Sequence, residues 1–219
     1  GTNGVQLWSW YATNEYMRAP YWPTNNVSRE GWGHVNGATR MSDGRTLISL
    51  RNFNQTIMVL SNGAADWVMD YTNLYGGVFN PPTDLGYDPH DPELSADETR
   101  MLVCLQRTSP YQVVELDVNT KTTTWEYART GLRTTRDANR LPNGNVLIVS
   151  VMATNRPEES VLFEVTPAGE VVWQMKFWDL DAFSQPGFFF KAQRLTVWPD
   201  TDGDGIVDAT DPYTSPLAG

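Results

Sequence analysis

The chain has 219 residues, of which 40% are hydrophobic and 12% aromatic, enough for one domain with a sizeable core. Its formal net charge is −10, and no run of lysine and arginine resembles a nucleic-acid footprint, so DNA and RNA are not expected partners. No apolar stretch approaches the roughly 20 residues of a membrane helix, and we therefore expect no transmembrane segment. Cys104 is the one cysteine, which excludes a disulfide framework and a cysteine-based metal site.

A turn residue followed four positions later by tryptophan recurs along the chain. The four copies read GVQLW, GAADW, KTTTW and GEVVW, and end at Trp8, Trp67, Trp125 and Trp173. An isolated strand does not explain four such copies, so the motif indicates an internal repeat. We interpret each tryptophan as part of the outer strand of a repeat, where it packs against the neighbouring repeat.

Three similar blocks emerge when the chain is aligned on these tryptophans. Each has a lead segment, a turn, two runs rich in β-branched residues, and the tryptophan strand. The turns are Asp43-Gly44, Asp97-Glu98 and Asn143-Gly144; Asp-Gly and Asn-Gly are strong hairpin signals. Four short strands per block, with tryptophans 48 to 59 residues apart, are typical of a propeller blade. No segment has helical periodicity over more than about two turns, so the chain is predicted to be nearly all β.

Two segments at the ends of residues 1–198 predict incomplete blades. Val5–Trp10 resembles the last strand of one blade, and Phe189–Val197 resembles the first strand of another. The predicted fold is therefore a β-propeller with three whole blades and two partial strands. Since known propellers have about four to eight blades, either it belongs to a larger ring or another chain completes it. The chain begins at Gly1 without a readable signal peptide, which leaves open a processed or truncated product.

The blocks also carry a family resemblance. WGHVNGATRMSDGRTLISLRN (32–52) resembles the D-W-x-H-x-N segment of the arylsulfotransferase family, with its following turn and S-R-N strand end. PHDPEL (89–94) and RDANRLPNGNVLI (136–148) resemble that family's later H-D-A-Q-x-L-P-N-G-N blade openings. FFKAQRL (189–195) is similar to the ending of smaller relatives.

This resemblance implies a six-bladed propeller that transfers a sulfuryl group from an aryl sulfate to a phenol, without a nucleotide sulfate donor. In the family the group passes through a sulfated histidine in the central channel. The chemistry is reasonable, because neutral imidazole is a good nucleophile near neutral pH. Guanidinium groups can bind the sulfuryl oxygens with paired hydrogen bonds.

Four residues are the candidate catalytic set under this resemblance. His34 takes the place of the histidine in D-W-x-H, and His90 takes that of the second blade opening. Arg51 and Arg107 each lie 17 residues beyond one of these histidines, which suggests equivalent blade positions. The family pattern would place another histidine in the third block, but the opening there reads Thr-Arg-Asp and no histidine follows His90. Either the nucleophile is His34 or His90, or it lies outside this chain, or the activity is lost.

Further arginines open the later blocks. Arg40, Arg140 and Arg194 recur in similar register in the lead segments, and Arg136 opens the third block. Arg136, Arg140 and Arg194 are candidate substrate-binding residues if they line an anion-binding channel. The alternative is that the recurring arginines pair with the many acidic residues.

Residues 199–219 form a separate acidic tail that predicts a calcium site. DTDGDGIVDATD (200–211) has the alternating acidic pattern of thrombospondin type 3 and dockerin-like calcium loops. The candidate ligands are Asp200, Asp202, Asp204, Ile206 through its carbonyl, Asp208 and Asp211. The alternative is a solvated acidic linker. A weak site of this kind suits extracellular calcium, so we expect a secreted, periplasmic or cell-surface protein.

The sequence therefore leaves two main functional hypotheses. The first is an extracellular arylsulfotransferase-like enzyme whose partners are an aryl sulfate and a phenol. The second is a non-catalytic extracellular propeller that serves as a structural, adhesion or assembly subunit, as a homo-oligomer or with a missing propeller half. Another propeller hydrolase or lyase is a more distant third.

The calcium site can be tested directly. Calorimetric titration of the full chain with calcium should show saturable binding, because the alternating carboxylates supply hard oxygen ligands. Changing Asp202 and Asp204 to alanine removes two of these ligands and should abolish the binding. Absence of heat with the unaltered chain would exclude the site.

Overall fold

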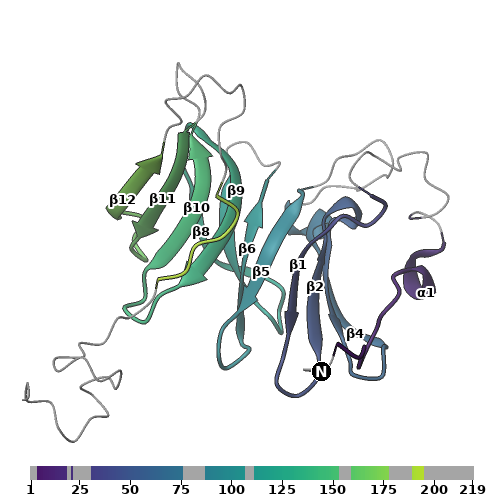
Figure 1. Cartoon of the computed structure of the whole chain (residues 1–219). Coiled ribbons are helices and arrows are strands. Elements are labelled where there is room, and N and C mark those ends of the chain that lie inside the picture. Colours follow the sequence, from purple (N-terminus) through teal and green to yellow (C-terminus); the bar gives the residue numbers. More distant parts are fainter. Residues whose placement is uncertain are drawn as a thin grey trace, which may run out of the picture.

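The computed structural model describes residues 4–18, 21, 31–75, 87–106, 111–152, 159–177 and 189–194, which form three antiparallel sheets of four strands each (Figure 1). Blade 1 comprises β1 (Val35–Arg40), β2 (Thr46–Leu50), β3 (Gln55–Val59) and β4 (Ala65–Asp70). Blade 2 comprises β5 (Pro89–Leu94), β6 (Arg100–Leu105), β7 (Gln112–Asp117) and β8 (Thr123–Ala128). Blade 3 comprises β9 (Leu132–Arg140), β10 (Val146–Met152), β11 (Glu159–Val165) and β12 (Val171–Phe177).

Each blade is a simple meander, and consecutive blades pack through their first strands. The strands of every sheet pair in chain order, and β5 contacts both β1 and β9. Thus β1, β5 and β9 are the inner strands and β4, β8 and β12 the outer ones. The prediction of a nearly all-β partial propeller with three whole four-stranded blades is confirmed. The helical elements among the described residues are α1 (Thr13–Tyr16) and two 3₁₀ turns, Arg51–Phe53 and Tyr71–Tyr75; none of them has the length and apolar character to span a membrane.

The turn residues are fixed by backbone geometry. In the hairpin between the first two strands of each blade, one residue has a left-handed backbone; these are Gly44, Glu98 and Gly144, with φ of 91°, 58° and 85°. The hairpin before each outer strand repeats this at Gly63, Lys121 and Gly169. Glycine adopts positive φ without the steric penalty of a side chain, which accounts for most of these choices. In this second set of hairpins the left-handed residue lies four positions before the tryptophan. The turn therefore sets the register that brings the indole to the blade interface.

The tryptophans join neighbouring blades by a repeated hydrogen bond. Trp67 Nε1 donates to the carbonyl of Val118 at 3.0 Å, in the hairpin before the outer strand of blade 2. Trp125 Nε1 donates to Pro167 at 2.9 Å, in the corresponding hairpin of blade 3. The interpretation of these tryptophans as contacts between blades is confirmed. Trp173 lies on β12, which is exposed along its whole length.

The N-terminal segment differs from its sequence prediction. Residues 5–10 form no strand, yet Trp8 Nε1 donates to the carbonyl of Ser61 at 3.0 Å, the bond that a preceding blade would supply. Trp8 and Trp10 pack against the apolar cluster of blade 1. A strand requires a hydrogen-bonded neighbour, and no described strand pairs with this segment. Only the tryptophan of the expected outer strand is therefore in place.

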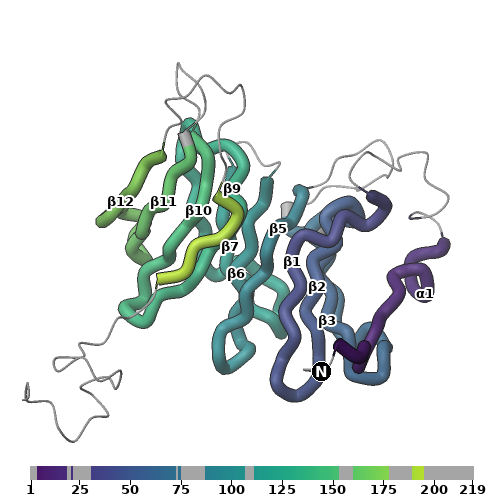
Figure 2. Tube along the Cα trace, viewed as in Figure 1, coloured from purple at the N-terminus to yellow at the C-terminus, as the bar shows by residue number. Residues whose placement is uncertain are grey.

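The C-terminal segment behaves similarly. The described part of the expected strand 189–197, residues 189–194, forms no strand but lies beside blade 3 (Figure 2). Both backbone groups of Ala192 bond to side chains of β9. The amide donates to Asp137 Oδ2 at 2.9 Å, and the carbonyl accepts from Asn139 Nδ2 at 3.1 Å. The segment thus takes the position of a fourth inner strand without a ladder, since no described second strand pairs with it.

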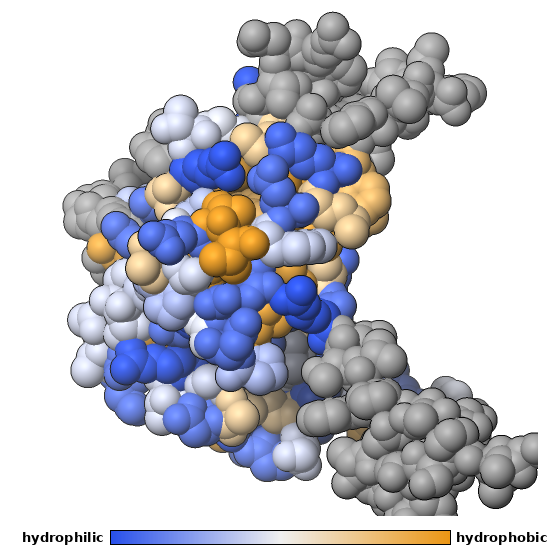
Figure 3. Space-filling model, turned by 90° about the vertical axis from the view of Figure 1, so that its left-hand side faces the viewer, coloured by the Kyte–Doolittle hydropathy of each residue, from blue (hydrophilic) through white to orange (hydrophobic). Residues whose placement is uncertain are grey.

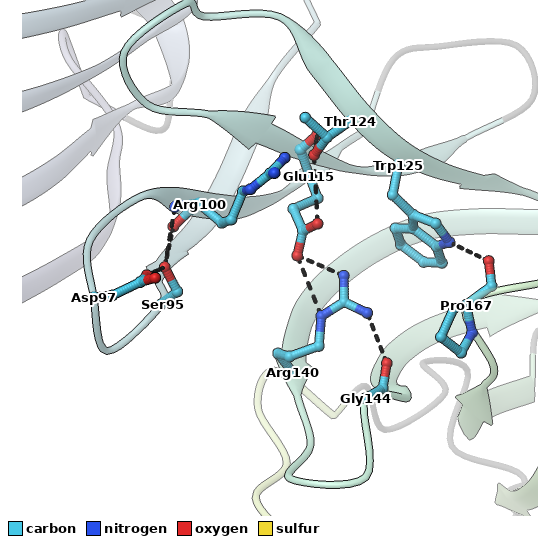
Figure 4. Close-up of polar contacts among 9 residues, drawn as sticks. All are labelled: Ser95, Asp97, Arg100, Glu115, Thr124, Trp125, Arg140, Gly144 and Pro167. Carbon is cyan, nitrogen blue, oxygen red and sulfur yellow. Dashed lines mark hydrogen bonds and ion pairs between the residues drawn. The ribbon is translucent and has the colours of Figure 1, made fainter.

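One position of the third strand decides the chemistry of each blade interface. Met58, Glu115 and Glu164 all pair across the sheet with the tryptophan of the outer strand. Glu115 Oε1 binds Arg140 Nη2 at 2.5 Å (Figure 4), and Glu164 binds Arg194 in the same manner. Met58 belongs to the apolar cluster between blades 1 and 2, against which Leu94 packs. Leu94 stands where the other inner strands have arginine, so an apolar pair replaces an ion pair.

The natural replacement of the ion pair by Met58 and Leu94 at the first interface predicts how the Glu115–Arg140 pair will respond to mutation. Glu115→Met and Arg140→Leu, made singly, should each lower the free energy of unfolding by about 1–3 kcal/mol, because each leaves a half-buried charge unpaired. The double variant reproduces the Met58–Leu94 pair and should recover most of that loss, as measured by urea unfolding.

Asp43→Asn serves as the control, because it weakens only the exposed pair with Arg45 and leaves the Arg45–Glu98 pair in place, and surface ion pairs contribute little. Losses that simply add in the Glu115→Met/Arg140→Leu double variant would contradict the idea that the two positions form one interacting pair.

Candidate functional site

A cavity of about 700 Å³ lies where the three inner strands begin, at the end opposite their hairpins. It is lined by side chains of all three blades and of the segment 189–194. These residues are His34, Asn36, Arg51, Asp88, His90, Gln106, Tyr111, Thr134, Arg136, Phe190 and Lys191. The cavity therefore brings together four residues expected from the sequence: His34, His90, Arg51 and Arg136.

The repeat places these residues at two distinct positions. His34, Asp88 and Thr134 each lie 10 residues before the left-handed residue in the first hairpin of their blade. Each of the three also has a positive φ, of 42°, 49° and 54° respectively. Asn36, His90 and Arg136 follow two residues later. The expected equivalence of His34 and His90 is therefore wrong. The shared spacing of 17 residues to an arginine has no structural counterpart, because the two histidines occupy different positions of the blade.

The left-handed residues aim the following side chains into the cavity. For residues other than glycine this backbone is uncommon and carries a free-energy cost. The strand pairing also shifts register next to each of them, between Val35 and Gly37, between His90 and Glu93, and opposite Val149 and Val151. Such bulges redirect side chains, and they recur beside functional sites.

Arg51 links the first two blades at the cavity. Its Nη2 donates to Asp88 Oδ2 at 2.9 Å, and Asp88 is only 3% exposed. Its Nη1 lies 3.4 Å from His34 Nδ1. Asp88 thus fixes one side of the guanidinium while the other side faces His34 and the cavity. Asp88 positions the arginine and holds it beside the imidazole.

His90 is the most buried basic group of the cavity. It is 6% exposed, and burial lowers its pKa to about 4, with the charges of Arg136 and Arg51 acting in the same direction. A hydrogen bond to the backbone of Arg136 opposes this shift in the pKa. Its Nδ1 has no hydrogen-bond partner among the described residues. His90 is therefore neutral at physiological pH, and its unpaired Nδ1 is buried.

Two aromatic residues complete the lining. Phe190 lies over the guanidinium of Arg136, with 4.4 Å from Cζ to the ring centroid. Tyr111 follows the segment 107–110, and Gln106 donates through Nε2 to the carbonyl of Thr135 at 2.9 Å. Gln106 directly follows β6 as Arg51 directly follows β2. The cavity therefore combines basic groups with aromatic faces.

Sequence reasoning missed several of these residues. Asp88 could have been found by counting 10 residues back from the hairpin, as for His34. Gln106, Tyr111, Phe190 and Lys191 carry no comparable signal, because they come from strand ends and from a segment without a ladder.

The remaining candidate residues lie elsewhere. Arg140 and Arg194 do not line this cavity; they pair with Glu115 and Glu164, the alternative that the sequence left open. Arg40 binds Thr46 Oγ1 at 2.9 Å and lies over the Trp8 ring. Arg107 and the proposed calcium ligands Asp200, Asp202, Asp204, Ile206, Asp208 and Asp211 fall outside the described residues. Within the described ranges, no group of three or more histidine, cysteine, aspartate or glutamate residues is placed to hold a metal ion.

A second cavity, of about 560 Å³, lies further along the inner strands. Its lining includes the carboxyl groups of Asp91, Glu93 and Asp137, with Asn139 and Lys191. Lys191 lines both cavities, so it stands between a basic and an acidic part of the inner surface.

Comparison with known proteins adds similarity to solved structures only. No protein-family model and no curated protein matches the chain. A protein of unknown function from Bacteroides caccae is 16% identical over 68% of this chain and 51% of its own, with a TM-score of 0.46. Hydrazine synthase of Kuenenia stuttgartiensis is 14% identical over 71% of this chain and 44% of its own, with a TM-score of 0.46. Virginiamycin B lyase from Staphylococcus aureus is 11% identical over 68% of this chain and 56% of its own, with a TM-score of 0.38.

The chain thus spans about half the length of the solved structures that it resembles. At these identities and TM-scores the likeness identifies no activity. The propeller architecture rests on the blades themselves.

The buried state of His90 predicts a pH dependence. An unfolded histidine binds a proton near pH 6.5, whereas folded His90 does so only near pH 4. The unfolded state therefore takes up the proton first, and His90 should cost stability progressively as pH falls from 6.5 to 4. Replacing His90 by glutamine should remove about 1–3 kcal/mol of this acid-dependent loss, as measured by urea unfolding at several pH values.

NMR titration provides the direct check. The chain has two histidines, so a His34→Gln variant assigns the remaining imidazole signal to His90. A His90 midpoint near 6.5 would contradict the burial argument.

Proposed function

We propose that this propeller transfers a sulfuryl group from an aryl sulfate to a phenol, with His90 as the group that carries it. The observation that carries the proposal is the neutral, buried His90, which lines a cavity together with Arg51 and Arg136 and has an unpaired, buried Nδ1. The family resemblance noted in the sequence points to the same chemistry.

The first step would be attack of His90 Nδ1 on the sulfur of the ester, after a movement of the ring that brings this buried atom to the cavity. The S–O bond to the aryl group breaks, its electron pair leaves on the phenolate oxygen, and an N–S bond forms. Because Nδ1 is unpaired and the backbone bond to Arg136 favours the charged ring, we assign that bond to Nε2–H donating to the Arg136 carbonyl. This carbonyl would stabilise the positive charge that the ring gains on sulfation.

The second step would return the enzyme to its starting state. The oxygen of the acceptor phenol attacks sulfur, the N–S bond breaks, and the electron pair returns to Nδ1. The acceptor proton passes to the departed phenolate or to solvent, so no redox partner or nucleotide donor is needed. The two steps are the double displacement expected of a histidine nucleophile.

The neighbouring residues have distinct roles in this scheme. The guanidinium groups of Arg51 and Arg136 would bind the sulfuryl oxygens, which carry negative charge throughout. Asp88 would hold Arg51 in place through its 2.9 Å ion pair. Phe190 and Tyr111 offer faces for the aryl ring. The proposal includes a secreted, periplasmic or cell-surface location and a structural calcium ion in the C-terminal loop.

A second candidate function is assembly with another blade-bearing surface. The outer strand β12 exposes apolar side chains along its length: Val171, Val172, Trp173, Met175 and Phe177. Figure 3, which views the molecule from the β12 end, shows hydrophobic surface interspersed with hydrophilic residues. In blades 1 and 2 the tryptophan of the corresponding outer strand donates a hydrogen bond to the next blade. This observation favours a structural or assembly subunit if the cavity lacks turnover.

Turnover of p-nitrophenyl sulfate with phenol as acceptor tests the proposal. The full chain should release nitrophenol in an acceptor-dependent manner, and His90→Gln should lower the rate at least 100-fold because the nucleophile is gone. Arg136→Gln should lower it about 10- to 1,000-fold through loss of an oxyanion partner. Mass spectrometry after a rapid alkaline quench should find sulfate on the His90 peptide.

His34→Gln and Lys176→Gln complete the design. His34→Gln should retain more activity than His90→Gln, and Lys176, on the exposed β12, is the matched surface control. Each variant is first shown to unfold cooperatively. Full activity of His90→Gln would exclude it as the carrier, and no release by folded, unaltered protein would favour the assembly function.

A further inference from the structure

One position of the inner strands carries a different group in each blade. Gly37, Asp91 and Asp137 each lie seven residues before the left-handed hairpin residue. Lys191 holds the same place relative to Arg194 as Asp137 does to Arg140. The four innermost segments thus present no side chain, two carboxyl groups and one ammonium group at one level of the inner surface.

Gly37 permits the close approach of this layer. A Cβ at that position would lie 3.0 Å from Asp91 Cα and 3.1 Å from Asp91 Oδ1, closer than side-chain atoms normally pack. Glycine therefore lets β5 lie directly against β1, and it leaves Asp91 enclosed at 6% exposure.

Only some of the carboxylate oxygen atoms at this level accept a hydrogen bond from a described donor. Lys191 Nζ binds Asp91 Oδ1 at 2.8 Å, whereas Asp91 Oδ2 and Glu93 Oε2 are buried and accept no hydrogen bond from a described donor. Asp137 Oδ2 accepts from Asn139 Nδ2 and from the Ala192 amide, both at 2.9 Å. Three carboxyl groups therefore share the 560 Å³ cavity, and Lys191 is the one basic residue among its described lining residues.

The excess of carboxyl groups over basic groups in this cavity raises the pKa values of two of the acids. Burial, together with the nearby charges of Asp137 and Asp91, raises the pKa of Glu93 to about 7, while a backbone hydrogen bond from Arg140 and the charge of Lys191 act in the opposite direction. Burial, the Asp91 charge and a hydrogen bond with the Asp91 carboxyl group raise the pKa of Asp137 to about 6, while hydrogen bonds from the Ala192 amide and from Asn139 act in the opposite direction. An additional positive group in the cavity would relieve both effects.

We propose that this acidic cavity is a binding site for a small aliphatic primary amine. Its ammonium group would lie beside that of Lys191 and donate to Asp91 Oδ2 and Glu93 Oε2, the two buried acceptors without partners. The contact of Lys191 with Asp91 shows that the site already accommodates one ammonium group. An ammonium fits better than a metal ion, since the described acids are not arranged as a metal-binding group. The site shares Lys191 with the basic cavity, and it does not depend on sulfuryl transfer.

Calorimetric titration of the full chain with 1,4-diaminobutane at pH 8 tests the proposal. At this pH Glu93 and Asp137 are largely ionised, and saturable binding is expected. Asp137→Asn/Glu93→Gln replaces two carboxylates by amides of similar shape and should weaken binding at least 10-fold. Lys191→Met keeps the apolar stem, frees Asp91 Oδ1 and should tighten binding several-fold.

Matched controls separate the site from the general acidity of the chain. Asp66→Asn/Glu126→Gln removes two exposed carboxylates from the outer strands β4 and β8 and should leave the affinity unchanged. Tetramethylammonium chloride at equal ionic strength has no N–H donor and should not bind. All variants are checked for cooperative unfolding before titration.

Three results would overturn the proposal: no saturable heat with the unaltered chain, equal binding of tetramethylammonium, or unchanged affinity in folded Asp137→Asn/Glu93→Gln. Unchanged affinity in Lys191→Met would also do so, because the proposed amine shares Asp91 with that lysine. Since this readout is binding alone, its failure is distinguishable from a failure of sulfuryl transfer.

Discussion

The indole hydrogen bond between blades is the constraint on which the architecture depends. A four-stranded sheet cannot cover both its faces, so each blade is stable only against a neighbour. Trp67 and Trp125 supply apolar area and also use their N–H groups on the next hairpin, at 3.0 and 2.9 Å. The N-terminal segment keeps only this element of a missing outer strand, because Trp8 bonds to Ser61 without any ladder. The tryptophan contact therefore forms even without the complete strand.

The same packing creates the inner surface and its division of charge. Since consecutive inner strands lie side by side, a given repeat position recurs at one level. His90 and Arg136, two residues after the left-handed Asp88 and Thr134, line a basic cavity. The next residues, Asp91 and Asp137, line an acidic cavity. A displacement of one residue along a strand changes the face that a side chain occupies. The strained residues His34, Asp88 and Thr134 thus select which chemistry faces which cavity.

Much of this fold could be predicted from the sequence because its signals are local. Turn residues and β-branched runs fixed the hairpins, and the recurring tryptophan identified the blades. The candidate site was predictable only in part: His34, His90, Arg51 and Arg136 do share a cavity. The errors arose where position depends on partners distant in sequence. The equal spacing after His34 and His90 ignored the bulges, and Arg140 is turned toward Glu115 by the neighbouring blade, which its own strand cannot reveal.

The spacing of these contacts in the chain has a consequence for folding. The tryptophan bond of the N-terminal segment joins residues 53 apart, and those of the two blade interfaces join residues 51 and 42 apart, so each links only adjacent parts of the repeat. Folding can then nucleate in one blade and spread to the next, as in other linear repeat arrays. The Lys191–Asp91 contact, which spans 100 residues, is different because it passes over a whole blade. This contact requires blade 3 to be folded between its two residues, so we expect it to form late in folding. Its formation would therefore report that all three blades are assembled.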